Sequence, residues 1–333
     1  MLDEYVKYYY LALNKEEKQA YLAVYEALRK KEKSVRLKKG LTCDYAKAIL
    51  WAVYSDCPSF YYLDPYTIRI CGYSTHSELI LKYIYTDEQI KQYDERLHKG
   101  CLLFKERYIT DNMSAYRKEF EIHNYLVRNI KYDYDAANHK KIVGEAYNVI
   151  GALLLKKAVC WGISLAFKLL ADYCGLKCFV VIGAASASWA GDNHAWNIVK
   201  LDDGCDYHLD VTWDIKENGE TKYYFEYMNL DDSMIGLDHS WNNWIYPECT
   251  QHTYNYYFRN GLFVRSLDDV TAFTEKKLRE GNDFVAFKYA RNKMPTAEQI
   301  LNAVIEGMKK VRPGKAAKAR VSPVTHNVYI EIQ

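Results

Sequence analysis

The segment AVCWGISLAFKLLADYCGL, residues 158–176, places the strongest single constraint on the fold. Its apolar residues recur at helical spacing, and Gly175 follows them where many helices end with a left-handed residue. Cys160 therefore lies in the first turn of a predicted helix. The run CFVVIGAA follows at once and predicts a short buried strand, so a helix that carries a thiol at its start leads directly into a sheet.

Two further segments, NHAWNIVKL and CDYHLDVTW, predict strands joined by the short loop at residues 202–204. A three-residue loop sets Leu201 opposite Cys205, and it places His194 and Asp210 on one face of the hairpin as diagonal neighbours. A two-residue loop would shift the register by one and place them on opposite faces. The sequence thus predicts a helical half followed by an antiparallel sheet.

The position of Cys160 suits a nucleophile, because the unpaired N–H groups and partial positive charge of a helix start stabilise a thiolate. The other eight cysteines are interpreted as small apolar residues. A nucleophilic cysteine needs a base and a group that orients the base. His194 opens a predicted strand after a loop, and Asp210 lies between Leu209 and Val211, where a buried carboxylate needs a partner.

The remaining histidines are weaker candidates. His208 shares the strand face of Asp210 and could tune the site, although a hydrogen-bonded strand histidine is the preferred interpretation. Five others lie in helical or loop contexts without an evident partner: His76, His98, His123, His139 and His326.

In this order, the motifs AVCWGISLAFKLLADYCGL, NHAWNIVKL and YHLDVTWD resemble the transglutaminase-like cysteine hydrolases, a superfamily related to papain-type folds. The flanking segments EIHNYLVRNIKYDYD and YYFEYMNLDDSMIGLDHSW resemble those of its bacterial members, so the resemblance covers about residues 114–244. It implies that Cys160 is the nucleophile, His194 the general base and Asp210 the carboxylate that orients it. We expect Asp210 to accept the Nδ1–H of His194. His239, in LDHSW, belongs to the resemblance with an open role.

Two departures from the family pattern, Ala158 and Ile163, affect substrate contacts beside the thiol and leave the triad untouched. The backbone N–H of Cys160 is one expected donor to an oxyanion, with Trp161 and Asn193 as candidates for the second. Trp196 is a further candidate contact to substrate.

No metal and no cofactor are expected. Cys174 and Cys178 have no second pair of ligands at zinc spacing. The acidic pairs at 202–203 and 231–232 lack the ligand number and glycine of a calcium loop, and no glycine-rich phosphate loop occurs.

The fold class predicted is α+β, with a papain-like core in which the cysteine helix packs on an antiparallel sheet. We expect a mainly helical region at 1–112, the catalytic core at 113–250 and a small α/β domain at 251–333. Residues 1–33 are predicted to be one amphipathic helix, and Asn260-Gly261 predicts a hairpin in the last domain.

The composition narrows the partners. Forty-five basic residues against 43 acidic ones leave a net charge of +2, which does not recruit nucleic acid or an anionic membrane. Nine cysteines, an odd number, indicate mainly reduced thiols. Without a recognisable signal peptide or long apolar segment, we expect a cytoplasmic protein.

The function predicted is that of a cysteine peptidase or amidase, which forms a thioacyl intermediate on a peptide or protein substrate. Two alternatives stay open at this point. One is transglutaminase-type transfer of the acyl group to an amine, and the other is a non-catalytic module that binds peptide or cell-wall fragments. The sequence does not fix the oligomeric state.

Overall fold

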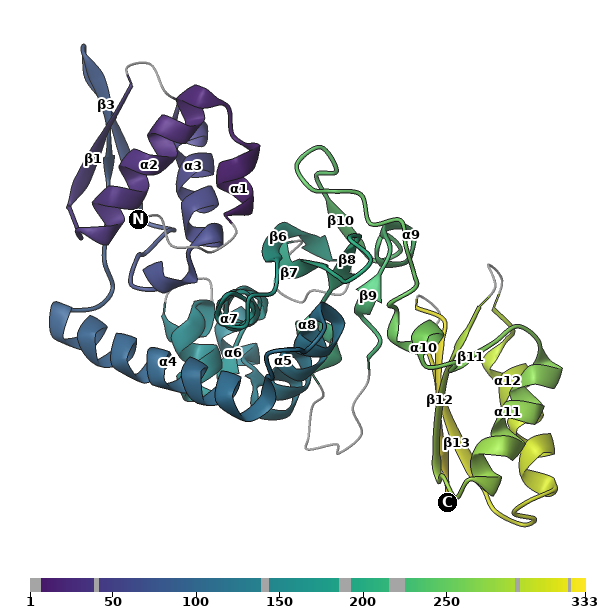
Figure 1. Ribbon diagram of the computed structural model, residues 1–333. Helices are drawn as coiled ribbons and strands as arrows, with labels where there is room; N and C mark the ends of the chain where they lie inside the picture. The colour runs from purple at the N-terminus through teal and green to yellow at the C-terminus, as the bar shows by residue number, and fades with distance from the viewer. Residues whose placement is uncertain are drawn as a thin grey trace. The chain divides into compact units, whose positions relative to one another are not determined.

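The computed structural model describes residues 7–38, 42–138, 144–185, 193–215, 225–290, 294–322 and 325–333. The chain forms two compact units (Figure 1). Unit 1 comprises Met1–Tyr224 and His239–Cys249, and unit 2 comprises Phe225–Asp238 and Thr250–Gln333. The architecture is α+β, as predicted. The boundaries predicted at 112/113 and 250/251 stay predictions.

Unit 1 holds the cysteine helix and most of the helices. Its helices are α1 (Tyr8–Ala12), α2 (Lys15–Arg29), α3 (Cys43–Asp56), α4 (Asp87–Tyr108), α5 (Ala115–Asn129), α6 (Tyr134–Asn138), α7 (Cys160–Tyr173) and α8 (Val211–Asp214). Its strands are β1 (Ser34–Lys38), β2 (Arg69–Gly72), β3 (His76–Ile80), β4 (Lys131–Tyr132), β5 (Lys157–Ala158), β6 (Cys178–Ala185), β7 (Asn193–Lys200), β8 (Asp206–Leu209) and β10 (His239–Trp241). Short 3₁₀ turns at Pro58–Phe60 and Glu145–Tyr147 and a π-helical turn at Ile150–Leu155 complete it.

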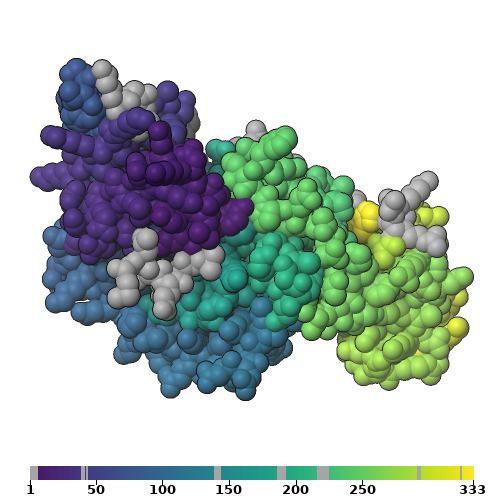
Figure 2. Space-filling view, turned by 45° about the horizontal axis from the view of Figure 1, so that its top comes forward, coloured from purple at the N-terminus to yellow at the C-terminus, as the bar shows by residue number. Residues whose placement is uncertain are grey.

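The N-terminal part of unit 1 differs from its prediction in two ways. The single helix expected at 1–33 is wrong, because Asn14 caps a new helix, α2, and forms a capping box with Glu17. Residues 1–6 lie outside the described part. The region also contains a three-stranded antiparallel sheet in the order β1-β3-β2, which the sequence reading missed. In Figure 2 the purple helices of this part lie beside the teal core of the same unit.

The core of unit 1 is α7 packed on the antiparallel strands β10, β6, β7 and β8, in that order. Two hydrogen bonds fix the helix on the central strand, from Ser164 Oγ to the Ala195 carbonyl at 3.0 Å and from Asn197 Nδ2 to the Ser164 carbonyl at 3.1 Å. Cys160 therefore starts a helix that is buried along its length and fixed to the strand that carries His194.

The β7–β8 hairpin has the register predicted from its loop. Leu201 and Cys205 close the turn, with the Leu201 N–H donating to the Cys205 carbonyl at 3.0 Å, and Asn197 pairs with Leu209. The strand predicted to continue through Trp213 is wrong beyond Leu209, because Asp210 caps the short helix α8. The backbone turns away from the sheet where the side-chain carboxylate of Asp210 bonds to it.

Unit 2 is a small α/β domain. It contains β9 (Met228–Leu230), α9 (Asp232–Ile235), α10 (Tyr256–Arg259), β11 (Phe263–Val264), α11 (Leu267–Arg279), β12 (Phe284–Tyr289), α12 (Ala297–Lys309), β13 (Ala317–Val321) and β14 (Asn327–Ile332). A four-stranded sheet, in the order β11-β12-β14-β13, shares one apolar core with α11 and α12.

The hairpin predicted at Asn260-Gly261 is wrong. Asn260 is the C-cap of α10, and Gly261 adopts a φ of +64°, the left-handed conformation that ends a helix. The following strand β11 pairs in parallel with β12, not with the segment before the turn. Across the described residues, no helix is both long and apolar enough to cross a bilayer.

Gly162, two residues into α7, permits close packing beside Cys160. A Cβ at this position would lie 2.5 Å from the Ala146 carbonyl oxygen and 2.9 Å from that of Asn148. Gly162→Ala is therefore expected to lower the free energy of unfolding by about 1–3 kcal/mol, because two backbone segments would have to move apart.

The matched control is Gly100→Ala, in α4, where a Cβ meets nothing within 4 Å. It should raise the free energy of unfolding by about 0.5–1 kcal/mol, since alanine loses less backbone entropy in a helix. Urea unfolding of both variants measures the difference, and equal effects would contradict this account of the packing.

Candidate active site

Cys160 begins α7, and its side chain is partly exposed. Val159 precedes it in an extended conformation, and no side chain caps the helix there. The first intrahelical hydrogen bond runs from the Ile163 N–H to the Val159 carbonyl at 3.0 Å. The N–H groups ahead of Ile163 thus lie where an anion beside the thiol could accept from them.

His194 is the second residue of β7, and its side chain is almost fully buried. Its Nε2 lies 2.7 Å from Asp210 Oδ2. Cys160 is near enough to the ring to help raise its pKa. The expectation that Nδ1 bonds to the carboxylate is wrong. Because Nε2 is taken by Asp210, Nδ1 is the nitrogen left for the sulfur.

Asp210 is fully buried between β8 and α8. Its Oδ1 accepts the backbone N–H groups of Thr212 at 2.8 Å and Trp213 at 3.3 Å, which fixes the carboxylate as the cap of α8. Its Oδ2 faces His194 at 2.7 Å and His239 Nε2 at 3.2 Å. One carboxylate therefore holds a helix end and two imidazole rings.

His239 completes this cluster from β10, where it pairs with Ala185, the last residue of β6. Its ring lies 4.5 Å from that of Trp213 and 5.0 Å from that of Trp196, centroid to centroid. The sequence reading left its role open. The signal available was its place in LDHSW, but 29 residues separate it from Asp210, and spacing along the chain does not reveal the contact.

The charges of the cluster support one another. Burial lowers the pKa of His194, but the Asp210 carboxylate and the Cys160 sulfur outweigh it and raise that pKa to about 10. Burial raises the pKa of Asp210, yet the rings of His194 and His239 lower it well below its usual range. At neutral pH the site therefore favours an imidazolium between a carboxylate and the sulfur.

The other predicted contact residues are dispersed. Asn193 is exposed at the start of β7, and it remains a candidate oxyanion donor together with Trp161. Trp161 is buried, with its ring 5.1 Å from that of Trp51. The prediction that Trp196 contacts substrate is wrong, because the side chain is fully buried and its indole N–H donates to His208 Nδ1 at 2.9 Å. It packs beside His194 and offers no donor to a substrate.

Two other histidines test the sequence-based interpretations. His208 is a hydrogen-bonded strand histidine, as expected. The interpretation that His123 has no evident partner is wrong. Its Nε2 lies 2.9 Å from Asp214 Oδ2, with both side chains fully buried. This pair joins α5 to α8, the helix that Asp210 caps.

His194, Asp210 and His239 are also residues of the types that bind metals, and their ligand atoms lie within 4.8 Å of one another. Two imidazoles and one carboxylate suit zinc or iron. In the described structure, however, the same atoms hydrogen-bond to each other. The absence of a metal stays a prediction.

Comparison with known proteins identifies the region that contains these residues. Residues 104–211 match the family model described as "Transglutaminase-like superfamily". The matched segment contains Cys160, His194 and Asp210. This chain therefore has a transglutaminase-like region, and the α7–sheet core is the core of that fold, as the sequence motifs predicted.

Solved structures similar to this chain include a TGase at 18% identity and a TM-score of 0.31. A candidate cysteine protease from Cytophaga hutchinsonii has 12% identity and a TM-score of 0.28, and a candidate protease from Parabacteroides distasonis 10% and 0.27. The alignments cover 46%, 44% and 43% of this chain and 46%, 61% and 35% of those chains, so less than two thirds of each is spanned. Among curated proteins, none matches this sequence.

Asp210→Asn is expected to lower the pKa of His194, because the carboxylate is what most strongly raises it. Because folding raises the pKa of His194, the protonated ring stabilises the fold. This contribution is complete below the unfolded-state pKa of about 6.5 and is lost as pH rises through about 10. Histidine ring NMR across pH measures the change. Asp206→Asn, at a carboxylate paired with Lys200, is the control that should leave His194 unchanged.

Proposed function

We propose that this protein is a cysteine hydrolase that cleaves a peptide or amide bond through Cys160, His194 and Asp210. The observation that carries the proposal is the His194 ring, which bonds to the Asp210 carboxylate through Nε2 at 2.7 Å and so leaves Nδ1 for the Cys160 sulfur. The influence of Cys160 on the pKa of His194 supports their proximity. The transglutaminase-like region supports cysteine-dependent acyl chemistry in general.

In the proposed reaction, the Cys160 thiolate attacks the substrate carbonyl and forms a tetrahedral oxyanion. The N–H groups at the start of α7 are placed to stabilise this charge. His194 gives its Nδ1 proton to the leaving amine as the C–N bond breaks, which leaves a thioacyl enzyme. Water then loses a proton to His194, attacks the thioester and releases the acid with the thiol.

Asp210 acts through His194. The carboxylate stabilises the imidazolium and binds the ring through Nε2, which leaves Nδ1 for the sulfur. Its own position depends on the backbone of α8 and on His239. His239 is thus a positioning residue in this proposal, since its contact is with the Asp210 carboxylate.

Transfer of the acyl group to an amine would proceed through the same thioacyl enzyme. We favour water as the acceptor because no sequence feature marks an amine site. The proposed substrate is a peptide or protein, and the proposed compartment is a reducing one. Both follow from the assignment of a cysteine thiol as the nucleophile.

Cys160→Ala and His194→Ala are expected to abolish hydrolysis of a mixed library of peptides and amides. Asp210→Asn should lower kcat/KM by about 10²–10⁴-fold, because roughly 3–5 kcal/mol of transition-state stabilisation is lost. His239→Phe, which removes one donor to Asp210, should lower it by about tenfold.

The control is His208→Ala, which should retain a measurable fraction of activity, because the ring of His208 accepts the indole N–H of Trp196. Circular dichroism confirms folding of each variant. Full activity of Cys160→Ala would refute the nucleophile. A new amide between the acyl group and an added amine, formed in place of the free acid, would favour the transferase.

A further inference from the structure

Three tyrosines approach Cys160 from separate segments of unit 1. Tyr132 ends β4, which pairs in parallel with β5 so that Tyr132 lies opposite Ala158, two residues before the thiol. The backbone bond from the Asp133 N–H to the Ala158 carbonyl, at 3.0 Å, fixes this register. Tyr132 is therefore held beside the start of α7.

Tyr147 follows a residue that pairs with the same segment. The Val159 N–H donates to the Ala146 carbonyl at 3.0 Å, so the residue before Tyr147 bonds to the residue before Cys160. The Tyr147 hydroxyl donates to the Ala136 carbonyl at 2.9 Å, so this ring is held at both ends.

Tyr66 comes from the N-terminal part of the chain, which no sequence motif connected to the site. Its ring lies 6.2 Å from that of Tyr147 and 5.3 Å from that of Trp51, both in edge-to-face geometry. Trp51 in turn meets Trp161, the residue after the thiol, at 5.1 Å. An unbroken series of aromatic contacts thus leads from Tyr147 through Tyr66 to the start of α7.

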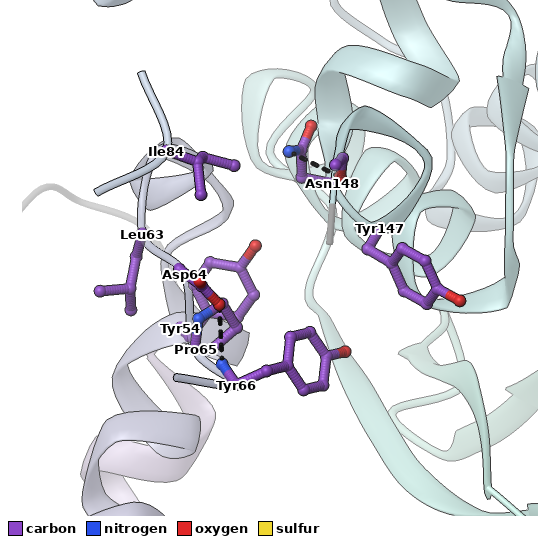
Figure 3. A pocket seen from close by; sticks show the side chains of 9 residues that line it. Tyr54, Leu63, Asp64, Pro65, Tyr66, Ile84, Tyr147 and Asn148 are labelled. Carbon is purple, nitrogen blue, oxygen red and sulfur yellow. Dashed lines mark hydrogen bonds between the residues drawn. The ribbon is translucent and has the colours of Figure 1, made fainter. Parts of the chain in front are cut away.

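The loop of Tyr66 is held firmly. The buried carboxylate of Asp64 accepts the Tyr66 N–H at 3.2 Å and the Thr67 hydroxyl at 2.7 Å. Figure 3 shows Tyr66 and Tyr147 on two different segments that line one pocket. The free volume of that pocket is about 10 Å³, room for roughly one water molecule.

The electrostatics agree with this proximity. For Tyr132 and Tyr147, burial raises the pKa of the hydroxyl most, and the charge of Cys160 follows as the next cause. For Tyr66, burial again leads, followed by Tyr54 and then Cys160.

We propose that Tyr66, Tyr132 and Tyr147 form an aromatic rim around Cys160, which admits only a slim acyl group. The substrate class is an extended peptide in which glycine or another small residue supplies the scissile carbonyl. The flat rings can pack on the faces of peptide groups, whereas a bulky side chain would displace rings that are held by neighbours. This inference rests on the proposed function for its substrate, and it makes the N-terminal region part of the site.

Access to the thiol tests the rim without turnover. The rate of alkylation at Cys160 is measured by peptide mapping with iodoacetamide and with N-benzyliodoacetamide, each normalised to its rate with N-acetylcysteine. The native protein should react at least about tenfold more slowly with the bulky reagent, and Tyr66→Ala should reduce this ratio to about threefold or less. Tyr66→Phe keeps the ring and should keep the ratio.

The control is Tyr73→Ala, at an exposed tyrosine next to the turn between β2 and β3, which should leave the ratio unchanged. If Tyr66→Ala does not fold, Tyr147→Ala tests the same rim from the core. Equal rates of the two reagents in the native protein, or an unchanged ratio in the folded rim variants, overturn the inference.

Peptide amides with glycine or phenylalanine before the scissile bond then separate the two proposals. Faster cleavage after glycine than after phenylalanine, with a smaller difference in Tyr66→Ala, supports the rim. Cleavage that favours phenylalanine overturns it while the hydrolase stands. Size-selective alkylation without cleavage of any amide refutes the hydrolase and leaves the rim as a feature of thiol access.

Discussion

The candidate site depends on the buried carboxylate of Asp210. It is fully enclosed, and a carboxylate removed from water must be compensated by donors or positive charge. Two backbone N–H groups of α8 bind one oxygen, and the rings of His194 and His239 face the other. The same contacts that satisfy the charge also end β8, start α8 and orient His194. Folding and the proposed chemistry therefore require one arrangement.

Around this carboxylate, the unit brings together segments that are distant in sequence. The helix α7 contributes the thiol and is fixed to β7 through Ser164 and Asn197. The far edge of the sheet contributes His239, and the N-terminal part contributes Tyr66 and Trp51. The rim proposed here gives that N-terminal part a reason to pack on the core, since it would select what reaches Cys160.

The parts that sequence predicted are those set by local chemistry. A cysteine at a helix start, a glycine at the helix end and a three-residue loop were sufficient for α7 and for the β7–β8 register. The errors arose where a local signal has two structural uses. Asn260-Gly261 suits a hairpin and equally a helix cap, and VTW suits a strand until the side chain of Asp210 caps it. The contacts of His239 and Tyr66 are long-range, and no pattern along the chain encodes them.

The central claim is that His194 activates one thiol among several. Site-resolved alkylation with iodoacetamide at pH 6 tests it, because Cys71 and Cys205 are partly exposed like Cys160 but have no such imidazole beside them in the described structure. The account predicts that Cys160 reacts at least about tenfold faster than both, and that His194→Ala removes this advantage. Equal rates at the three cysteines, or an advantage that survives His194→Ala, would contradict it.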